Sequence, residues 1–431
     1  MTKALWASGH VPRRRQLFNR RECMMTQRKS DTAEVAEWLR DAAEPFDVPH
    51  DDRSPGALPA LADLMEDVVV AGIGMTTRAG HEVSVTAHRV LRTLVERKGF
   101  RALALLDDET VVAALDDYTR TGHGDPRELL GDAWVPWRNT ETLAVLRWLR
   151  EFNRAHPDDP VRLFGLTPEA AKPAHYAQVR DFVATVAPDR LDDLRAHYDP
   201  IVSAHRVGEH LQRAGGTHPG RPFVDHARDA LALVESLPGA AGGPAALDAA
   251  RLIVRYHQFS TASGRRDFAA EAADAADRIA AWHERTGQRI AYWEGISNTA
   301  VAPRLTIAAM SQEFPTTGFL LRKRFGTGYL SLAIAFHTGE LRADLTVPAP
   351  SPEFADSALD HPGHAGYLLD LRTAPPGPVR RWLHRPTRLR LIIGTYHRDR
   401  DADHHIAGAG VGDWFDILLR IRTVTPTHHL A

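Results

Sequence analysis

The sequence predicts an α/β fold with a mixed, mostly parallel central sheet flanked by helices, and with an all-helical insertion that forms a cap over the pocket. Apolar, β-branched runs alternate with helical patterns up to residue 166, and strand patterns return after residue 286. Only helical patterns lie between them. The predicted parts are a basic flexible arm at 1–30, core segments at 31–166 and 286–431, and the helical insertion at 167–285.

The composition is that of a globular protein. The chain has 431 residues, of which 43% are hydrophobic, and its formal net charge of -2 gives no overall attraction to nucleic acid or to an anionic membrane. No apolar run reaches the length of a membrane span, and the first residues lack a signal-peptide core, so a cytoplasmic location is expected. The single Cys23 excludes an internal disulfide. We expect a small-molecule partner, with the oligomeric state open.

The first thirty residues differ from the rest of the chain. They contain eight basic residues and one acidic residue, Glu22, and their apolar residues show no periodicity. We interpret the segment as a mobile arm. A transit peptide would have a similar composition, and a true translation start at Met24 or Met25 explains it equally well.

The first core segment predicts a βαβ unit. The run VVVAGIG at 68–74 is a strand, helical spacing of apolar residues follows from Val83 to Val95, and Gly99 ends the helix. FRALALL at 100–106 is a second strand, buried on both faces because it hardly alternates. A helix and the strand VRLFGL at 161–166 follow. Parallel strands bring their carboxyl ends to one edge of the sheet, where ligands usually bind.

The remaining elements complete the predicted fold. The insertion contains four helical patterns separated by glycine-rich turns such as PGAAGGP, and a long surface loop is expected at 348–378. Later strands are predicted in the runs QRIAYWEG, GYLSLAIAFHTG, GYLLDL, RLRLIIGTYH and DWFDILLRI.

Several phrases occur in a characteristic order. They are LVERKGFRALAL at 94–105, WRNTETLAVLRWLREFN at 137–153, ERTGQRIAYW at 284–293, LLRKRFGTGYLSLAIAF at 320–336 and the closing WFDILLRIRTVTPTHHL. With these phrases, residues 33–428 resemble the erythromycin esterase family. The resemblance implies hydrolysis of macrolide lactones, or of unknown substrates, by a constellation at the carboxyl edge of the sheet beneath helical walls.

The family's catalytic pattern is substituted here. Where the family has Gly-Glu-Ala-Thr-His-Gly after the first strand, this chain has Met75 in place of the acid and Arg78 in place of the histidine. Leu106 replaces a second glutamate, and Asn298 replaces a later histidine, whereas the family's glutamate at position 82 persists as Glu82. Ester hydrolysis needs a general base near working pH, and arginine stays protonated. The hydrolytic network is therefore expected to be lost.

Polar residues at the same edge are the candidate site. The predicted catalytic residues are Arg78, Glu82, Glu294, Asp108 and His81, and the predicted substrate-binding residues are Met75, Leu106, Asp107, Asn298 and Tyr292. Arg78 offers a planar fork of donors at a helix start, which suits an anion.

Each acidic or basic candidate also has a structural interpretation. Asp107 and Asp108 could cap the following helix, His81 could be a surface or a helix-start residue, and Glu82 could pair with Arg78. No metal site is predicted: His205 and His210 are five residues apart, which does not favour one helical face, and DADHH at 401–405 falls in a polar loop. No cofactor is expected, because Gly72-Ile73-Gly74 alone is too little for a dinucleotide site.

These observations give two functional hypotheses. The first is a metal-independent, repurposed enzyme of natural-product biosynthesis or modification that catalyses a cyclisation, elimination or rearrangement. The alternative is a pseudoesterase that binds a small molecule or a partner protein, and a residual ester hydrolase is third. An open cavity into which Arg78 and Glu294 point would support chemistry, whereas a cavity filled by Met75 and Leu106 would contradict it.

Overall fold

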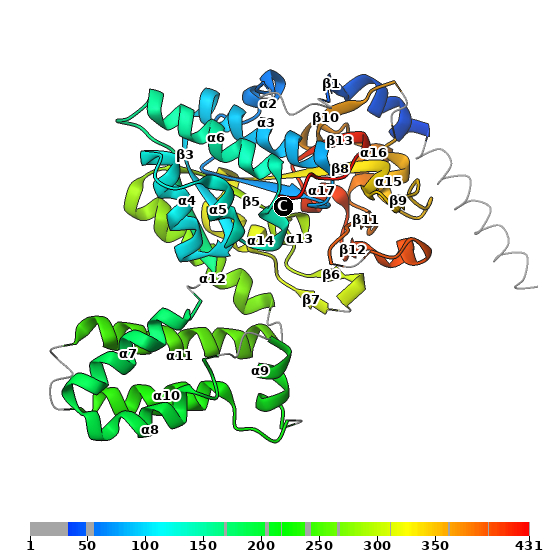
Figure 1. Ribbon diagram of the computed structural model, residues 1–431. Helices are drawn as coiled ribbons and strands as arrows, with labels where there is room; N and C mark the ends of the chain where they lie inside the picture. The colour runs from blue at the N-terminus through cyan, green and yellow to red at the C-terminus, as the bar shows by residue number, and fades with distance from the viewer. Residues whose placement is uncertain are drawn as a thin grey trace, which may run out of the picture.

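The structure, a computed structural model, is an α/β core with a separate helical bundle (Figure 1). The residues that it describes are 33–48, 56–167, 170–202, 207–216, 218–237, 243–264, 268–310, 312–360, 363–394 and 396–430. The predicted arm at 1–30 lies outside the described residues.

A nine-stranded sheet forms the centre of the described part of the chain. Strands β13, β8, β2, β5, β3 and β4 run parallel to one another, whereas β10, β1 and β9 pair antiparallel. The order across the sheet is β1 (Glu44–Phe46), β10 (Gly366–Asp370), β13 (Ile417–Val424), β8 (Tyr329–Arg342), β2 (Val70–Met75), β5 (Arg289–Gly295), β3 (Phe100–Asp108) and β4 (Arg162–Thr167), with β9 (Leu345–Val347) beside β8. The predicted mixed, mostly parallel sheet is confirmed.

Helices cover both faces of this sheet. Apolar residues of α3 and α6 pack with Ile73, Leu103 and Trp293 on one face. On the other face, α12 and α14 pack with Val70 and Tyr292, the other set of alternating side chains. The helices of the core are residues 33–42, α2 (Pro59–Asp63), α3 (His81–Lys98), α4 (Glu109–Thr121), α5 (Pro126–Gly131), α6 (Thr140–Ala155), α12 (Phe268–Thr286), α13 (Ile296–Thr299), α14 (Thr317–Phe325), α15 (Ala355–Ala358), α16 (Pro378–Leu383) and α17 (Val411–Trp414).

Short 3-10 turns join several of these elements. They are η1 (Val135–Trp137), η4 (Ala308–Met310), η5 (Gly326–Gly328), η6 (Leu371–Thr373) and η7 (Arg398–Asp403). Across the described ranges, none of the helices has the length and apolarity that crossing a membrane requires.

A second, four-stranded antiparallel sheet departs from the sequence prediction. Its order within the described residues is β11 (Arg388–Arg390), β12 (His405–Ala407), β6 (Leu305–Ile307) and β7 (Gln312–Phe314). RLRLIIGTYH was expected to be a longer strand, but only its first three residues form one, in this second sheet. Within the predicted loop at 348–378, α15 and η6 form in addition to β10, a strand that the run GYLLDL predicts. Pairing with sequence-distant partners, rather than local pattern, selects these short elements.

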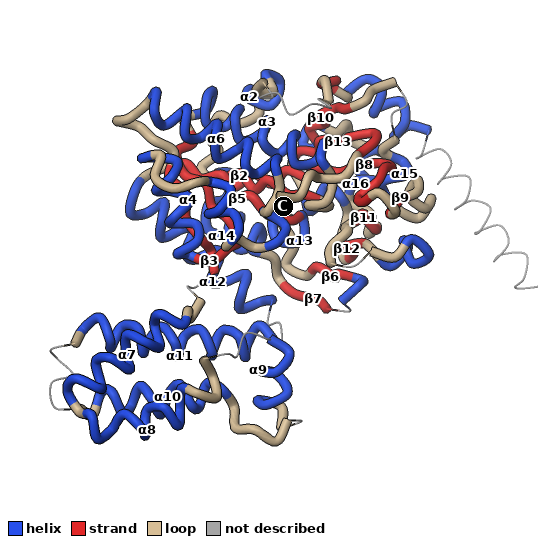
Figure 2. Tube along the Cα trace, viewed as in Figure 1, coloured by secondary structure: helices blue, strands red, loops and turns tan. Residues whose placement is uncertain are grey.

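The helical bundle has its own apolar core. Tyr176, Tyr198, Phe223 and Ile253 are buried inside it. Its elements are α7 (Pro173–Val186), η2 (Pro188–Arg190), α8 (Leu191–Tyr198), α9 (Val207–Ala214), α10 (Phe223–Glu235) and α11 (Pro244–Gly264). Figure 2 shows helices and loops in this bundle and the strands in the α/β core. The last helix of the predicted insertion, α12, instead packs on the sheet.

The glycines of β2 are explained by close packing. A Cβ on Gly74 would meet the Thr299 hydroxyl at the end of α13, and the Leu332 carbonyl oxygen at 2.8 Å. A Cβ on Gly72 would meet the hydroxyl of Tyr329, which donates to the Thr299 carbonyl at 2.6 Å. Gly72 and Gly74 therefore let α13 and the Tyr329 side chain pack closely against β2, which is a packing role rather than a nucleotide-binding one.

We expect Gly74→Ala to lower the free energy of unfolding by about 1–3 kcal/mol, because the added methyl overpacks a backbone contact. Gly131→Ala is the matched control: a Cβ added there would meet no atom within 4 Å, so a change of at most about 1 kcal/mol is expected. Urea unfolding of both variants measures the difference. Equal stabilities would contradict the close-packing explanation.

Candidate functional site

The candidate site centres on an ion pair between Arg78 and Glu294. β2 ends at Met75, and Arg78 lies in the turn that leads to α3. β5 runs beside β2 with Glu294 opposite Gly74, so both strands deliver their ends to the same place. Arg78 Nη2 contacts Glu294 Oε2, and the two side chains are only 13% and 3% exposed. The structure therefore brings the two predicted residues together, but as partners of each other.

Asn298 completes the polar group. It lies in α13, immediately after β5, and its Nδ2 donates to Glu294 Oε1 at 2.9 Å. Glu294 thus has one oxygen directed to an amide and the other to a guanidinium. This arrangement fixes the carboxylate with polar partners on two sides.

Two tryptophans lie against the guanidinium, and a third packs against one of them. The Arg78 Cζ atom lies 4.7 Å from the ring centre of Trp134 and 5.6 Å from that of Trp137. Trp137 packs edge-on against Trp293, with ring centres 5.8 Å apart. Trp134 is 41% exposed and the neighbouring Val135 is 59% exposed. Sequence reasoning missed Trp134 and Trp137, because their approach to Arg78 depends on how η1 folds back over the sheet edge.

Met75 and Leu106 are packing residues. Met75 is 2% exposed, and its sulfur accepts from Trp293 Nε1 at 3.2 Å in the apolar cluster beneath α3. Leu106 is half-buried against the cluster on the opposite face. Met75 and Leu106 therefore do not face one shared cavity. The site is neither an open cavity into which Arg78 and Glu294 point nor a cavity filled by Met75 and Leu106, because Arg78 and Glu294 contact each other.

Tyr292 belongs to the cluster beneath α12 and α14. It is 1% exposed, and burial raises the pKa of its phenol well above the ordinary value, with repulsion from Glu294 acting in the same direction. The phenol is therefore neutral and enclosed. With so little of the side chain exposed, contact between Tyr292 and a substrate remains a prediction.

Glu82 fixes another part of the chain rather than pairing with Arg78. Its carboxylate, 1% exposed, accepts from the Thr425 amide at 2.7 Å and from the Thr425 hydroxyl at 2.9 Å. The alternative in which Glu82 pairs with Arg78 is not what the structure has, since Arg78 contacts Glu294. Glu82 attaches residues after β13 to the start of α3.

Asp108 and Asp107 act on neighbouring backbone. Asp108 caps α4, accepting from the Thr110 amide at 2.8 Å, and also accepts from the Ala170 amide. The capping alternative holds for Asp108. Asp107 accepts instead from the Trp134 amide at 2.7 Å, and burial raises the pKa of its carboxyl. Asp107 thereby positions the loop that carries the tryptophan over Arg78.

His81 begins a helix, as one of its two structural alternatives expected, but its side chain is buried rather than on the surface. It is the first residue of α3, is 2% exposed, and its Nδ1 lies 2.7 Å from Glu141 Oε1. His428 Nδ1 reaches the same oxygen at 2.9 Å. Although burial acts in the opposite direction, hydrogen bonds from His81, the Glu141 backbone and His428 hold the pKa of Glu141 below its ordinary value.

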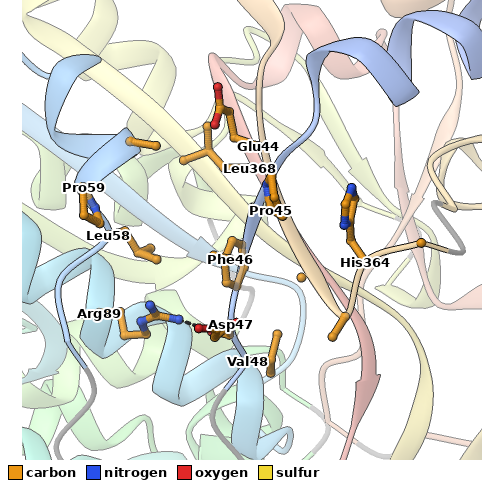
Figure 3. A pocket seen from close by; sticks show the side chains of 14 residues that line it. Glu44, Pro45, Phe46, Asp47, Val48, Leu58, Pro59, Arg89, His364 and Leu368 are labelled. Atoms are coloured by element: carbon orange, nitrogen blue, oxygen red, sulfur yellow. Dashed lines mark hydrogen bonds between the residues drawn. The ribbon is translucent and has the colours of Figure 1, made fainter.

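A separate cavity of about 580 Å³ contains none of the predicted site residues (Figure 3). It lies between β1, the start of α2, α3 and residues 363–366. Its cation, Arg89, donates to the carbonyl oxygens of Asp47 and Gly56 and lies over the Phe46 ring. The guanidinium thus attaches β1 and its neighbouring segment to α3, which is a structural role.

We expect Arg78→Ala and Glu294→Ala each to lower the free energy of unfolding by about 3–5 kcal/mol, because each leaves the other charge buried and unpaired. The double variant is expected to lose less than the sum of the two. Urea unfolding of the four proteins of this cycle gives the coupling free energy.

The control is Arg154→Ala, which removes an ion pair with Glu151 whose side chains are 68% and 63% exposed. A loss below about 1 kcal/mol is expected there. Additive losses in the Arg78–Glu294 cycle would show that the two charges are not energetically coupled.

Comparison with solved structures shows the same fold in other proteins. A Bacillus cereus protein is 20% identical, with a TM-score of 0.68 over 92% of this chain and 99% of that one. A succinoglycan biosynthesis protein is 19% identical, with a TM-score of 0.66 over 92% and 98%. A mutant of the erythromycin esterase EreC in its open conformation is 14% identical, with a TM-score of 0.55 over 85% and 93%. No curated protein matches the sequence.

The sequence itself matches a family model. The model of erythromycin esterase matches residues 95–424, beginning beyond Arg78 and continuing through β13. The match includes strands β3 to β8, and among them β5, which carries Glu294. Since it extends over most of the chain, this protein belongs to the erythromycin esterase family.

Proposed function

We propose that this family member binds a small organic anion at Arg78 and does not hydrolyse esters by the histidine-dependent route that the family resemblance implies. The observation that supports this most directly is the Arg78–Glu294 pair beneath Trp134. The pair occupies the carboxyl edge of the parallel strands, where the family is expected to hold its acid and base.

The chemistry of the edge argues against the family's hydrolytic route. Met75 has no ionisable group and is packed against Trp293, and Arg78 cannot accept a proton. The neighbouring imidazole of His81 is hydrogen-bonded through Nδ1 to Glu141. Water activation at this edge therefore lacks the base that the family pattern would supply.

The same residues suit an anion with an apolar body. A guanidinium presents a planar fork of donors to a carboxylate or phosphate, and the amino terminus of a helix favours negative charge. The exposed faces of Trp134 and Val135 would contact the apolar part of the ligand. An incoming anion competes with Glu294 for Arg78, so binding opens the internal ion pair.

A non-hydrolytic enzyme is the second candidate, and the opening of that pair favours it. A substrate anion that takes over Arg78 leaves Glu294 with Asn298 as its remaining side-chain hydrogen-bond partner among the described residues. A carboxylate freed in this way can remove a proton from the bound molecule. This chemistry fits a cyclisation, elimination or rearrangement in natural-product biosynthesis.

Small aromatic carboxylic acids and their methyl esters form a direct test. We expect the acids to stabilise the protein, by about 2.7 kcal/mol at a concentration of 100 times the dissociation constant, and the esters to remain uncleaved. Arg78→Lys should weaken acid binding roughly tenfold because it loses the bidentate fork. Calorimetry measures the binding, and mass spectrometry measures the esters.

Arg127→Lys is the control, since Arg127 is an exposed residue of α5. Acid binding that is equal in both lysine variants would contradict the assignment of Arg78, and rapid hydrolysis of an ester or a macrolide lactone would overturn the proposed loss of hydrolysis. To distinguish the anion-binding protein from the enzyme, wild-type protein and Glu294→Gln are each incubated with intermediates made by enzymes of neighbouring genes. If wild-type protein converts an intermediate and Glu294→Gln does not, while both bind acids equally, the protein is an enzyme.

A further inference from the structure

A second group of chemically active side chains lies beside the site, and the proposed function does not use it. His81, Glu141 and His428 come from α3, α6 and the residues after β13, so they are far apart in the sequence. One potential metal-ligating atom from each lies within 4.8 Å of the other two. Folding therefore assembles two imidazoles and one carboxylate at one point.

The backbone fixes this convergence from both sides. The segment of residues 424–430 crosses the beginnings of α3 and α6. The His81 amide donates to the Thr425 carbonyl at 2.8 Å, and the Thr140 amide donates to the His428 carbonyl at 2.8 Å. The three side chains are held by main-chain hydrogen bonds as well as by their contacts with one another.

Two of the three side chains are buried and the third is exposed. Glu141 and His81 have side chains that are each 2% exposed, whereas the His428 side chain is 60% exposed. The two buried ligands form a fixed base, and the exposed imidazole lies between that base and solvent. An ion could enter from the His428 side, with water available to complete its coordination.

We propose that His81, Glu141 and His428 bind a divalent transition metal, with Zn²⁺ as the best match. Two histidine nitrogens and one carboxylate are a common zinc ligand set, which leaves a fourth position for water. Imidazole ligands select zinc and related metals over Mg²⁺ or Ca²⁺.

Only small movements are needed. A tetrahedral zinc ion with bonds of about 2.0–2.2 Å separates its ligand atoms by roughly 3.3–3.6 Å. The present hydrogen-bonded separations from Glu141 Oε1 are 2.7 Å to His81 and 2.9 Å to His428. Metal binding replaces these hydrogen bonds by coordination, with His428 able to adjust on its exposed side. The bound ion would join the 424–430 segment to α3 and α6.

The sequence predicts no metal site here because the three ligands do not form a local motif. His81 and Glu141 are 60 residues apart, and Glu141 and His428 are 287 apart. His428 belongs to the closing phrase of the chain, where no neighbouring residue marks it as a metal ligand. The site becomes visible only when β13 brings the 424–430 segment to the start of α3.

The test uses tag-free, chelator-treated protein titrated with ZnCl₂ in a calorimeter, with CoCl₂ as a spectroscopic probe. We expect one equivalent of zinc to bind and to raise the Tm, and cobalt to give the visible absorption of a tetrahedral site. Loss of one ligand in His428→Ala should weaken zinc binding by more than the roughly 10–100-fold typical for loss of an outer-shell partner. Glu141→Gln should have the same effect.

His429→Ala is the matched control, because His429 is the exposed neighbour of His428. It should leave zinc affinity and the cobalt spectrum unchanged. Because His428 is exposed, its replacement should leave the metal-free Tm within a few degrees of the wild-type value. The proposal is overturned if wild-type protein binds no zinc, or if His428→Ala binds zinc as tightly as His429→Ala does.

Discussion

Parallel hydrogen bonding of β2 to β5 and β8 determines where the two central charges of the sheet edge, Arg78 and Glu294, lie. Gly74 is paired with Glu294 on one side and with Ala333 on the other, so the carboxyl end of β2 opens between two fixed neighbours. Without that register, Arg78 would not lie beside Glu294. The glycines of β2 preserve it by letting α13 and Tyr329 approach closely. The position of the site is thus determined first by strand pairing and only then by the side chains themselves.

Charge at this edge is mostly neutralised within the protein. Arg78 contacts Glu294, Glu82 binds Thr425, and Asp108 binds the start of α4. A sequence that places four charged groups at one edge suggests a reactive pocket. In the folded chain, however, most of these groups bind other residues of the protein and have a structural role. The Arg78–Glu294 pair differs, because the half-exposed Trp134 lies over its guanidinium. It is the part of the edge where a ligand could exchange with an internal partner.

Local patterns predicted the elements that repeat regularly and missed those that depend on distant partners. The spacing of apolar residues predicted α3 between its glycine boundaries, and the unalternating FRALALL run predicted the buried strand β3. The short strands β1 and β12 pair with β10 and β6, which lie far away along the chain, so they carry little local signal. The same limit applies to the site: Arg78 and Glu294 follow from parallel strand ends, whereas Trp134, Thr425 and His428 reach that edge through loops whose course no local pattern specifies.

The insertion of the helical bundle into the α/β core also has a consequence for the order of folding. Both neighbours of β2 in the sheet, β5 and β8, are encoded after the bundle, so the central strand emerges from the ribosome long before any partner exists. The bundle buries its own apolar core and can fold while β2 is still unpaired. Closure of so long a loop is slow, and an unpaired β-branched strand is prone to aggregate. During synthesis, this protein is therefore expected to depend on protection of its first core segment until residues near 340 have been made.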